Sequence, residues 1–221
     1  MKRSPFVTAA VLFAGLGALA TLAICGGAGA SIVNKSSSPA FVYVAFGADS
    51  GVTGWDFCHI EGRLQCKFPL APGEHQVLPT SGKYLNATIS FGGPVVTPAS
   101  GGIPPSAGCG KTKVELNLNN PKWFDTIDIS LVDGFDRKVS ITAKDSVGTH
   151  ELAVKGPAGN EKAFGVYPLG CDICTARQNP PCGMSPGSDG CKLGTQYKPD
   201  VPCQYQGTKM GGGTTATITL F

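Results

Sequence analysis

Charged side chains are scarce in this 221-residue sequence, and those present are not grouped. Lysine and arginine number 18 and aspartate and glutamate 15, together 15% of the chain, for a formal net charge of +3. Proteins that bind nucleic acid or an anionic membrane through charge carry basic clusters, which this sequence lacks. The three histidines, His59, His75 and His150, are isolated and indicate neither a catalytic triad nor a metal site. We therefore expect no nucleic-acid or membrane partner for the mature chain, and no cofactor or metal.

Helical periodicity is also lacking, since no segment of ten or more residues has the apolar spacing of an amphipathic helix. Short β-type runs, separated by many of the 31 glycines and 17 prolines, take its place. The pattern predicts a mostly β protein, an antiparallel sandwich or barrel. The run Ala40–Phe46 is apolar on both faces, which predicts a strand buried on both sides. The runs are Ala40–Phe46, Tyr84–Phe91, Lys113–Leu118, Thr126–Val132, Val139–Ala143 and Thr214–Phe221.

One long apolar run is present, near the N-terminus. Lys2 and Arg3 precede the uncharged run 6–24, and Ala28-Gly29-Ala30 has the small residues of a signal-peptidase site. The run predicts an export signal, a secreted protein and Ser31 as the first mature residue. The alternative is an uncleaved membrane anchor, because the run approaches the roughly 20 residues that span a bilayer. Loss of the two basic residues would leave 16 basic and 15 acidic residues, a net charge of +1.

Cysteines behind an export signal predict disulfides, because exported proteins fold where thiols oxidise. Eight cysteines permit about 105 pairings, and only the local pair Cys58–Cys66 is predicted from its spacing. Cys171 and Cys174 have the spacing of a zinc or redox pair, but export favours disulfides and the onward spacing fits no common zinc module. The eight cysteines are Cys58, Cys66, Cys109, Cys171, Cys174, Cys182, Cys191 and Cys203.

The chain divides into four parts by composition. Residues 1–30 form the signal, and 31–155 hold most of the β-type runs. Residues 156–213 contain five of the eight cysteines and few apolar side chains, which predicts a loop region held by disulfides. Residues 214–221 are predicted to return to the core as a strand.

A sequence motif gives a family resemblance. The run Asp128–Phe135, D-I-S-L-V-D-G-F, resembles the characteristic run of thaumatin-like proteins, and it lies within the similar stretch Lys113–Asp136. The resemblance covers about Ser31 to Ala143 and the final strand. It implies a thaumatin-like antiparallel β-sandwich with a disulfide-rich loop region, in a monomer. The chain departs from the family at Ser36, which stands where a cysteine is usual, and in the absence of its usual partner near the C-terminus.

The resemblance also implies an acidic cleft that binds β-1,3-glucan. Residue by residue, Glu115, Asp128 and Asp133 match three of its carboxylates, and Asp200 is the candidate for the fourth. The alternation of the runs agrees independently, because it places Glu115 and Asp128 on the polar faces of their strands. Carboxylates in such places are also common as solvated surface groups and as ordinary turn residues.

The cation of the family cleft has no match. An arginine is expected about seven residues before Glu115, where this chain has Gly108, and Lys111 and Lys113 are only loose substitutes. This departure favours binding over catalysis.

Three functions stay open on the sequence alone. The first is a secreted protein that binds β-1,3-glucan or a related cell-wall polysaccharide, with the antifungal defence role that the resemblance implies. The second is a weak endo-β-1,3-glucanase with Glu115 and Asp128 as its catalytic pair. The third is a structural or interaction domain at the cell surface. Asn34 and Asn86 begin glycosylation sequons, which matter only if the source is eukaryotic.

Overall fold

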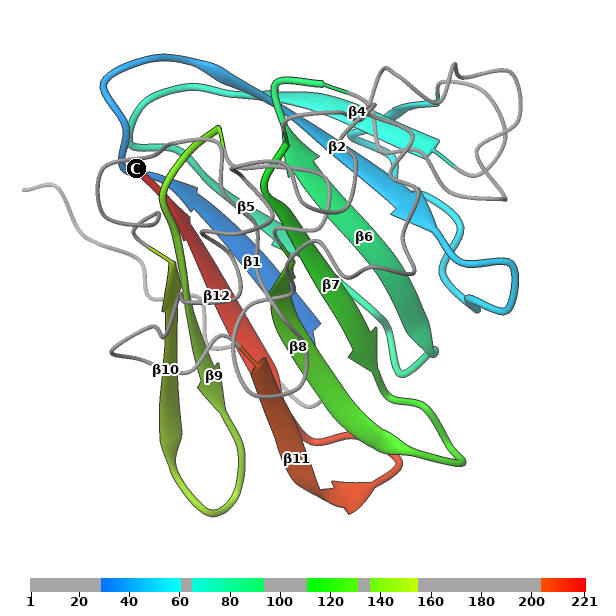
Figure 1. Cartoon of the computed structure of the whole chain (residues 1–221). Helices are drawn as coiled ribbons and strands as arrows, with labels where there is room; N and C mark the ends of the chain where they lie inside the picture. Colours follow the sequence, from blue (N-terminus) through cyan, green and yellow to red (C-terminus); the bar gives the residue numbers. More distant parts are fainter. Residues whose placement is uncertain (1–28, 61–64, 94–110, 131–135, 155–203) are drawn as a thin grey trace, which may run out of the picture.

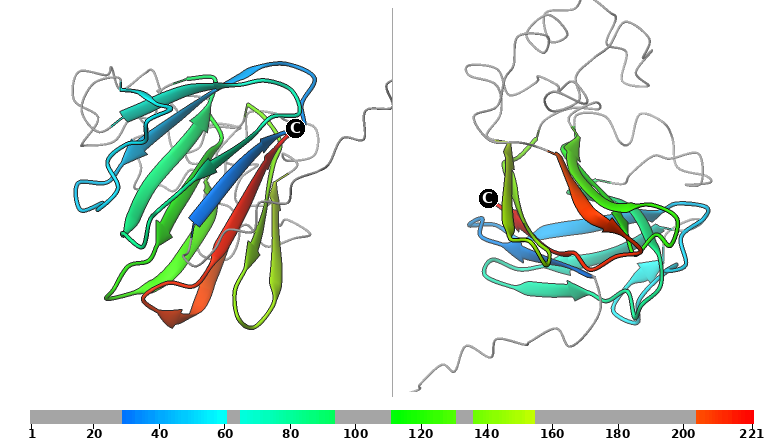
Figure 2. Two further views of the ribbon diagram at one scale, coloured as in Figure 1. Left: turned by 180° about the vertical axis from the view of Figure 1, so that it is seen from behind. Right: turned by 90° about the horizontal axis from the view of Figure 1, so that it is seen from below.

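Two β-sheets lie face to face and enclose one apolar core (Figures 1 and 2). The computed structural model describes residues 29–60, 65–93, 111–130, 136–154 and 204–221. These described residues are strands, turns and loops, with no helix, and so with none long and apolar enough to span a membrane. The predicted mostly β, sandwich-type fold is confirmed.

The smaller sheet has five strands in the order β10-β9-β12-β1-β5. Its pairs are antiparallel except that β1 and β12, the first and last strands, run parallel side by side (blue and red in Figure 1). The strand bounds are β1 Gly29–Asn34, β5 His75–Leu78, β9 Val139–Lys144, β10 Thr149–Val154 and β12 Thr215–Leu220.

The larger sheet has seven strands in the order β11-β8-β7-β6-β2-β4-β3, all paired antiparallel. The strand bounds are β2 Ala40–Phe46, β3 His59–Ile60, β4 Gln65–Leu70, β6 Leu85–Phe91, β7 Lys113–Leu118, β8 Phe124–Ser130 and β11 Gln204–Met210.

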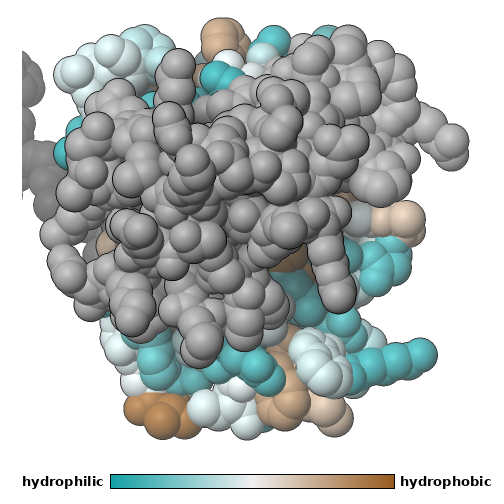
Figure 3. Space-filling model, in the orientation of Figure 1, coloured by the Kyte–Doolittle hydropathy of each residue, from teal (hydrophilic) through white to brown (hydrophobic). Residues whose placement is uncertain are grey.

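Alternation along the strands places the core between the sheets. Leu116 and Ile127 face inward from β7 and β8, and Ile218 faces them from β12, each 0–2% exposed. Burial of such side chains stabilises the fold by roughly 25 cal/mol per Å² of apolar surface removed from water. The exposed large apolar residues are few, and in Figure 3 the described surface shows separate brown areas among teal ones. The inward face of each strand was predicted correctly for β7 and β8.

Strand β2 differs in part from its prediction, because its outer face is buried at Ala45, which is 2% exposed, and not at the two aromatic positions. Val42 and Val44 lie in the core, whereas Phe41 is 50% exposed and Tyr43 is half-buried on the outer face. The Lys67 ammonium lies 4.9 Å from the Phe41 ring centroid and 5.2 Å from that of Tyr43. The cation and its alkyl stem cover these rings, which allows aromatic residues to occupy an outer sheet face.

The end of the predicted loop region 156–213 is a strand. Gln204–Met210 forms β11, pairs with β8 and shifts register between Gln206 and Met210. This segment is polar and contains Gly207, so its alternation is too weak to predict a strand. Residues 155–203 lie outside the described part. At the other end, β1 begins at Gly29, so Ser31 is its third residue.

A polar clasp, formed by Tyr205 and Asp145, joins β11 of the larger sheet to the β9–β10 turn of the smaller one. The Tyr205 hydroxyl on β11 donates to Asp145 Oδ2 in the β9–β10 turn at 2.6 Å, and Asp145 Oδ1 accepts the Val147 and Gly148 amides at 2.8 and 2.9 Å. The Tyr205 hydrogen bond, with the two amides, holds the pKa of Asp145 well below its usual range. Burial, followed by the Asp145 hydrogen bond, raises the pKa of Tyr205 to about 12. His150 Nε2 lies 3.6 Å from Asp145 Oδ1.

The clasp predicts a pH-dependent stability. Because the pKa of Asp145 is lower when folded, its contribution is complete above its unfolded pKa of about 3.9 and is lost as the pH falls through the folded pKa. We expect Asp145→Asn to lower Tm at about pH 6, and the gap from the wild type to shrink toward about pH 2. Tyr205 has the opposite sign, with its contribution complete below about pH 10 and lost as the pH rises toward 12. Thermal unfolding across this range checks both signs, and a gap that stays constant from about pH 6 to pH 2 would contradict the first.

Candidate functional site

The outer face of β6, β7 and β8 carries a row of polar side chains, Thr88, Glu115 and Asp128, which we call the acidic row. Thr88, Glu115 and Asp128 are direct cross-strand partners, so they stand side by side across three strands. Glu115 is exposed, whereas Thr88 and Asp128 are half-buried. The apolar residues on either side of each carboxylate point into the core, which is why the carboxylates face away from it.

A second row, which we call the amide row, lies two residues away on the same strands and consists of Asn86, Asn117 and Thr126. Asn86 on β6 pairs with Asn117 on β7, and Asn117 pairs with Thr126 on β8. Together the two rows line a pocket of about 300 Å³, near the lower end of the usual range for small-molecule sites. The lining residues are Tyr84, Asn86, Ala87, Thr88, Glu115, Leu116, Asn117, Thr126, Ile127 and Asp128.

Tyr84 also lines the pocket and takes part in a polar network. Partial burial, followed by the nearby charge of Asp49, raises the pKa of Tyr84, although hydrogen bonds from Asn120 and Asn86 act in the opposite direction. Asp49 Oδ1 also accepts the Asn86 amide at 2.8 Å. The phenol is therefore neutral at physiological pH, and it is hydrogen-bonded to Asn86 in the second row.

Lys113, which the sequence indicated only as a loose substitute for the missing arginine, is a functional candidate in the structure. It lies on the same face of β7 as Glu115, two residues away, between Ser90 and Ser130 on the neighbouring strands, and is 7% exposed. A cation therefore flanks the acidic row. Lys111 is placed elsewhere, with its Nζ 3.3 Å from Asp136 Oδ2. Both lysines have the strand parity of Glu115, and the signal in the sequence that separates them is the start of the β-type run at Lys113.

The structure describes two of the four predicted cleft carboxylates. It brings Glu115 and Asp128 together as neighbours, whereas Asp133 and Asp200 lie outside the described residues. Among those described, no group of three His, Cys, Asp or Glu side chains is arranged to hold a metal ion.

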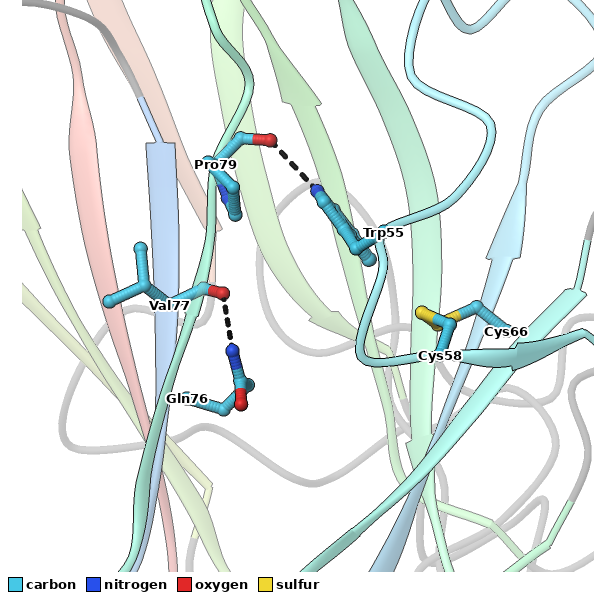
Figure 4. Close-up of a disulfide and its surroundings, with 6 residues drawn as sticks. All are labelled: Trp55, Cys58, Cys66, Gln76, Val77 and Pro79. Carbon is cyan, nitrogen blue, oxygen red and sulfur yellow. Dashed lines mark hydrogen bonds between the residues drawn. A yellow bond between two sulfur atoms is a disulfide. The ribbon is translucent and has the colours of Figure 1, made fainter.

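The predicted disulfide Cys58–Cys66 is confirmed (Figure 4). It ties the segment before β3 to β4, beside Trp55, whose indole N–H donates to the Pro79 carbonyl at 2.8 Å. The predicted disulfide cysteines outside the described residues are Cys109, Cys171, Cys174, Cys182, Cys191 and Cys203.

The two sequons have different surroundings. Asn34 is fully buried, and its amide donates to the carbonyls of Leu70 and Ser38 at 2.9 and 3.0 Å, so it cannot carry a glycan in the folded protein. Asn86 lines the pocket, where a glycan on its amide would fill the site.

Comparison with known proteins finds solved structures that are similar to this chain. No family model and no curated protein matches the chain. Among solved structures, the chain is similar to the thaumatin-like xylanase inhibitor TLXI, with 15% identity, a TM-score of 0.40 and coverage of 87% of this chain and 99% of that one. The protein elicitor MoHrip2 from Magnaporthe oryzae is similar at 12% identity, with a TM-score of 0.40 and coverage of 87% and 98%.

Proposed function

We propose that the protein binds a cell-wall polysaccharide, β-1,3-glucan or a related glycan, in the pocket on β6, β7 and β8. The observation that carries this proposal is the pairing of an acidic row with an amide row in one pocket of about 300 Å³. Sugar hydroxyls both donate and accept, so they suit a site in which carboxylates accept and amides and hydroxyls do both. The Tyr84 ring supplies an apolar surface of the kind that packs on sugar rings.

We also place this activity outside the cell. The Cys58–Cys66 disulfide supports an oxidising compartment, in agreement with the export signal. An antifungal defence role remains part of the proposal through the thaumatin-like resemblance alone.

One observation favours the glucanase as a second candidate. Glu115 and Asp128 are direct cross-strand partners, whose Cβ atoms are normally about 4.5–5.5 Å apart. Retaining glycosidases need carboxyl groups at roughly 5–5.5 Å. The glucanase predicts reducing ends released from soluble β-1,3-glucan, whereas the binding protein retains the polymer unchanged.

A pull-down on insoluble β-1,3-glucan tests the proposal. Glu115→Gln and Asp128→Asn each replace a charged acceptor with a neutral amide, and we expect each to weaken binding by about 10-fold or more. Glu151→Gln is the matched control, because Glu151 is exposed on β10 and bonds Thr142 away from the pocket. Binding left unchanged by both pocket variants would remove these carboxylates from the site. Sugar release abolished by Glu115→Gln would establish the enzyme instead.

A further inference from the structure

The hydrogen-bond polarity of Asn117 is fixed from outside the pocket. The Lys122 backbone N–H donates to Asn120 Oδ1 at 3.0 Å, which identifies the oxygen end of that amide. The nitrogen end of Asn120 then donates to Asn117 Oδ1 at 3.4 Å. Because its oxygen accepts from Asn120, Asn117 points its NH₂ group away from Asn120. Asn117 therefore presents a donor to the pocket that it lines.

Asn86 has the opposite polarity. Its nitrogen donates to Asp49 Oδ1 at 2.8 Å, and a carboxylate can only accept, so the nitrogen end is identified without ambiguity. The same amide also hydrogen-bonds the Tyr84 hydroxyl. Both N–H groups are thereby engaged on one side, and Asn86 presents its carbonyl oxygen as an acceptor.

Gly47 holds this amide in place. A Cβ on Gly47 would lie 2.6 Å from Asn86 Nδ2 and 2.7 Å from its Cγ, distances that real Cβ atoms do not adopt. Gly47 N also donates to the Asn86 carbonyl at 2.9 Å. The backbone of this loop therefore packs directly on the Asn86 side chain, and only glycine permits the contact.

The two amides are direct cross-strand partners, so a fixed acceptor and a fixed donor lie next to each other in the pocket. A secondary amide offers the complementary pair, with one N–H to donate and one C=O to accept. A plain hydroxyl adapts to either polarity and gains nothing from this arrangement. A site with a set polarity discriminates against ligands that leave its groups unpaired.

We propose that the pocket selects glycans bearing an acetamido group, with Asn86 accepting from its N–H and Asn117 donating to its C=O. This inference rests on the proposed function, and it names the substrate class as polysaccharides of N-acetylated amino sugars. A peptide backbone also contains secondary amides, but the acidic row of Glu115 and Asp128 favours a ligand rich in hydroxyl donors. The pocket volume of about 300 Å³ suits one sugar unit with its substituent.

Two β-1,4-linked tetramers make a matched test, since N-acetylglucosamine and glucose tetramers differ only at the 2-substituent. We expect calorimetry to show at least about 10-fold tighter binding of the N-acetylated tetramer by the full chain. Asn117→Asp keeps the shape but replaces the donor with an acceptor, and should bring the affinities for the two tetramers to within about 3-fold of each other. Gly47→Ala, which displaces Asn86, should reduce the preference in the same way. A cooperative thermal unfolding transition shows that each variant is folded.

The outcomes separate this inference from the proposed function. Equal affinity for the two tetramers, both weakened by Glu115→Gln, would overturn the acetamido inference and leave glycan binding in place. A preference for the N-acetylated tetramer that survives Asn117→Asp would also overturn it, because the amide pair would not be its source. Failure to bind either tetramer or β-1,3-glucan would overturn both. Equal binding of a short N-acetylated peptide would overturn the selection of glycans, because any secondary amide would then suffice.

Discussion

Replacement of Asp125 by alanine is expected to lower the free energy of unfolding by about 3–5 kcal/mol, the largest effect of any single polar substitution that we predict. Asp125 is 1% exposed, and its two oxygens accept the backbone amides of Asn119 at 2.7 Å and Thr214 at 3.0 Å. Alanine leaves two donors without partners, one of them on the buried Thr214. Each unsatisfied buried group costs about 1–3 kcal/mol, and hydrogen bonds to a charged acceptor are at the high end of the usual range.

The location of Asp125 explains why its replacement would destabilise both sheets. Its carboxylate joins the β7–β8 turn to the residue that precedes the final strand, and so links the two sheets. In that turn Asn119 has a φ of 60°, and a Cβ on the neighbouring Gly212 would collide with its side chain. The carboxylate therefore stabilises a tight, positive-φ arrangement that has few alternative partners.

Equilibrium urea unfolding measures the effect, and Asp125→Asn is the matched control. The asparagine keeps one acceptor oxygen and turns an NH₂ group toward the other amide, so we expect a loss of similar sign and at least half the size. A loss below about 1 kcal/mol for Asp125→Ala would mean that water replaces the carboxylate at both amides.

The strand faces of the site could be predicted from the sequence, because burial of one sheet face imposes alternation. In β7 and β8 the apolar residues recur at every second position, and this parity alone is enough to place Glu115 and Asp128 on the outer face. The prediction for β2 was wrong at Phe41 and Tyr43 for a related reason. Alternation cannot distinguish a buried outer face from one covered by a cross-strand lysine such as Lys67.

The polarity of the pocket could not be predicted, because it depends on contacts between distant segments. Asn86 is oriented by Asp49, 37 residues away, and by the close approach of Gly47. The clasp joins Tyr205 to Asp145 across 60 residues. Such hydrogen bonds leave no periodic trace in a single sequence, and they form only once loops from both ends of the strands meet. The side chains of β11 are polar and do not alternate clearly, so its pairing with β8 likewise could not be predicted.

Removal of the Cys58–Cys66 disulfide is expected to lower the free energy of unfolding by about 2–3 kcal/mol. The bond closes a loop with a sequence separation of 8, and loop-closure entropy assigns about that value to a ring of this size. The double variant Cys58→Ser with Cys66→Ala suits the site, because Cys66 is fully buried in the apolar core while Cys58 is half-buried. Changing both residues leaves no thiol from this pair to exchange with other cysteines.

The loss of stability should appear first in the segment before β3, which the disulfide links to β4. Strand β3 has only two residues and pairs with β4 at the sheet edge, so the preceding segment depends on the disulfide and on aromatic packing. Trp55 stacks on Phe57 with centroids 5.5 Å apart, and the chain has one other tryptophan, Trp123, which is 53% exposed. In a Trp123→Phe background, Trp55 fluorescence should become more accessible to acrylamide at urea concentrations below the main unfolding transition. Coincident loss of Trp55 protection and of β-sheet signal would instead show that this edge unfolds with the core, and that the disulfide acts on the whole sandwich.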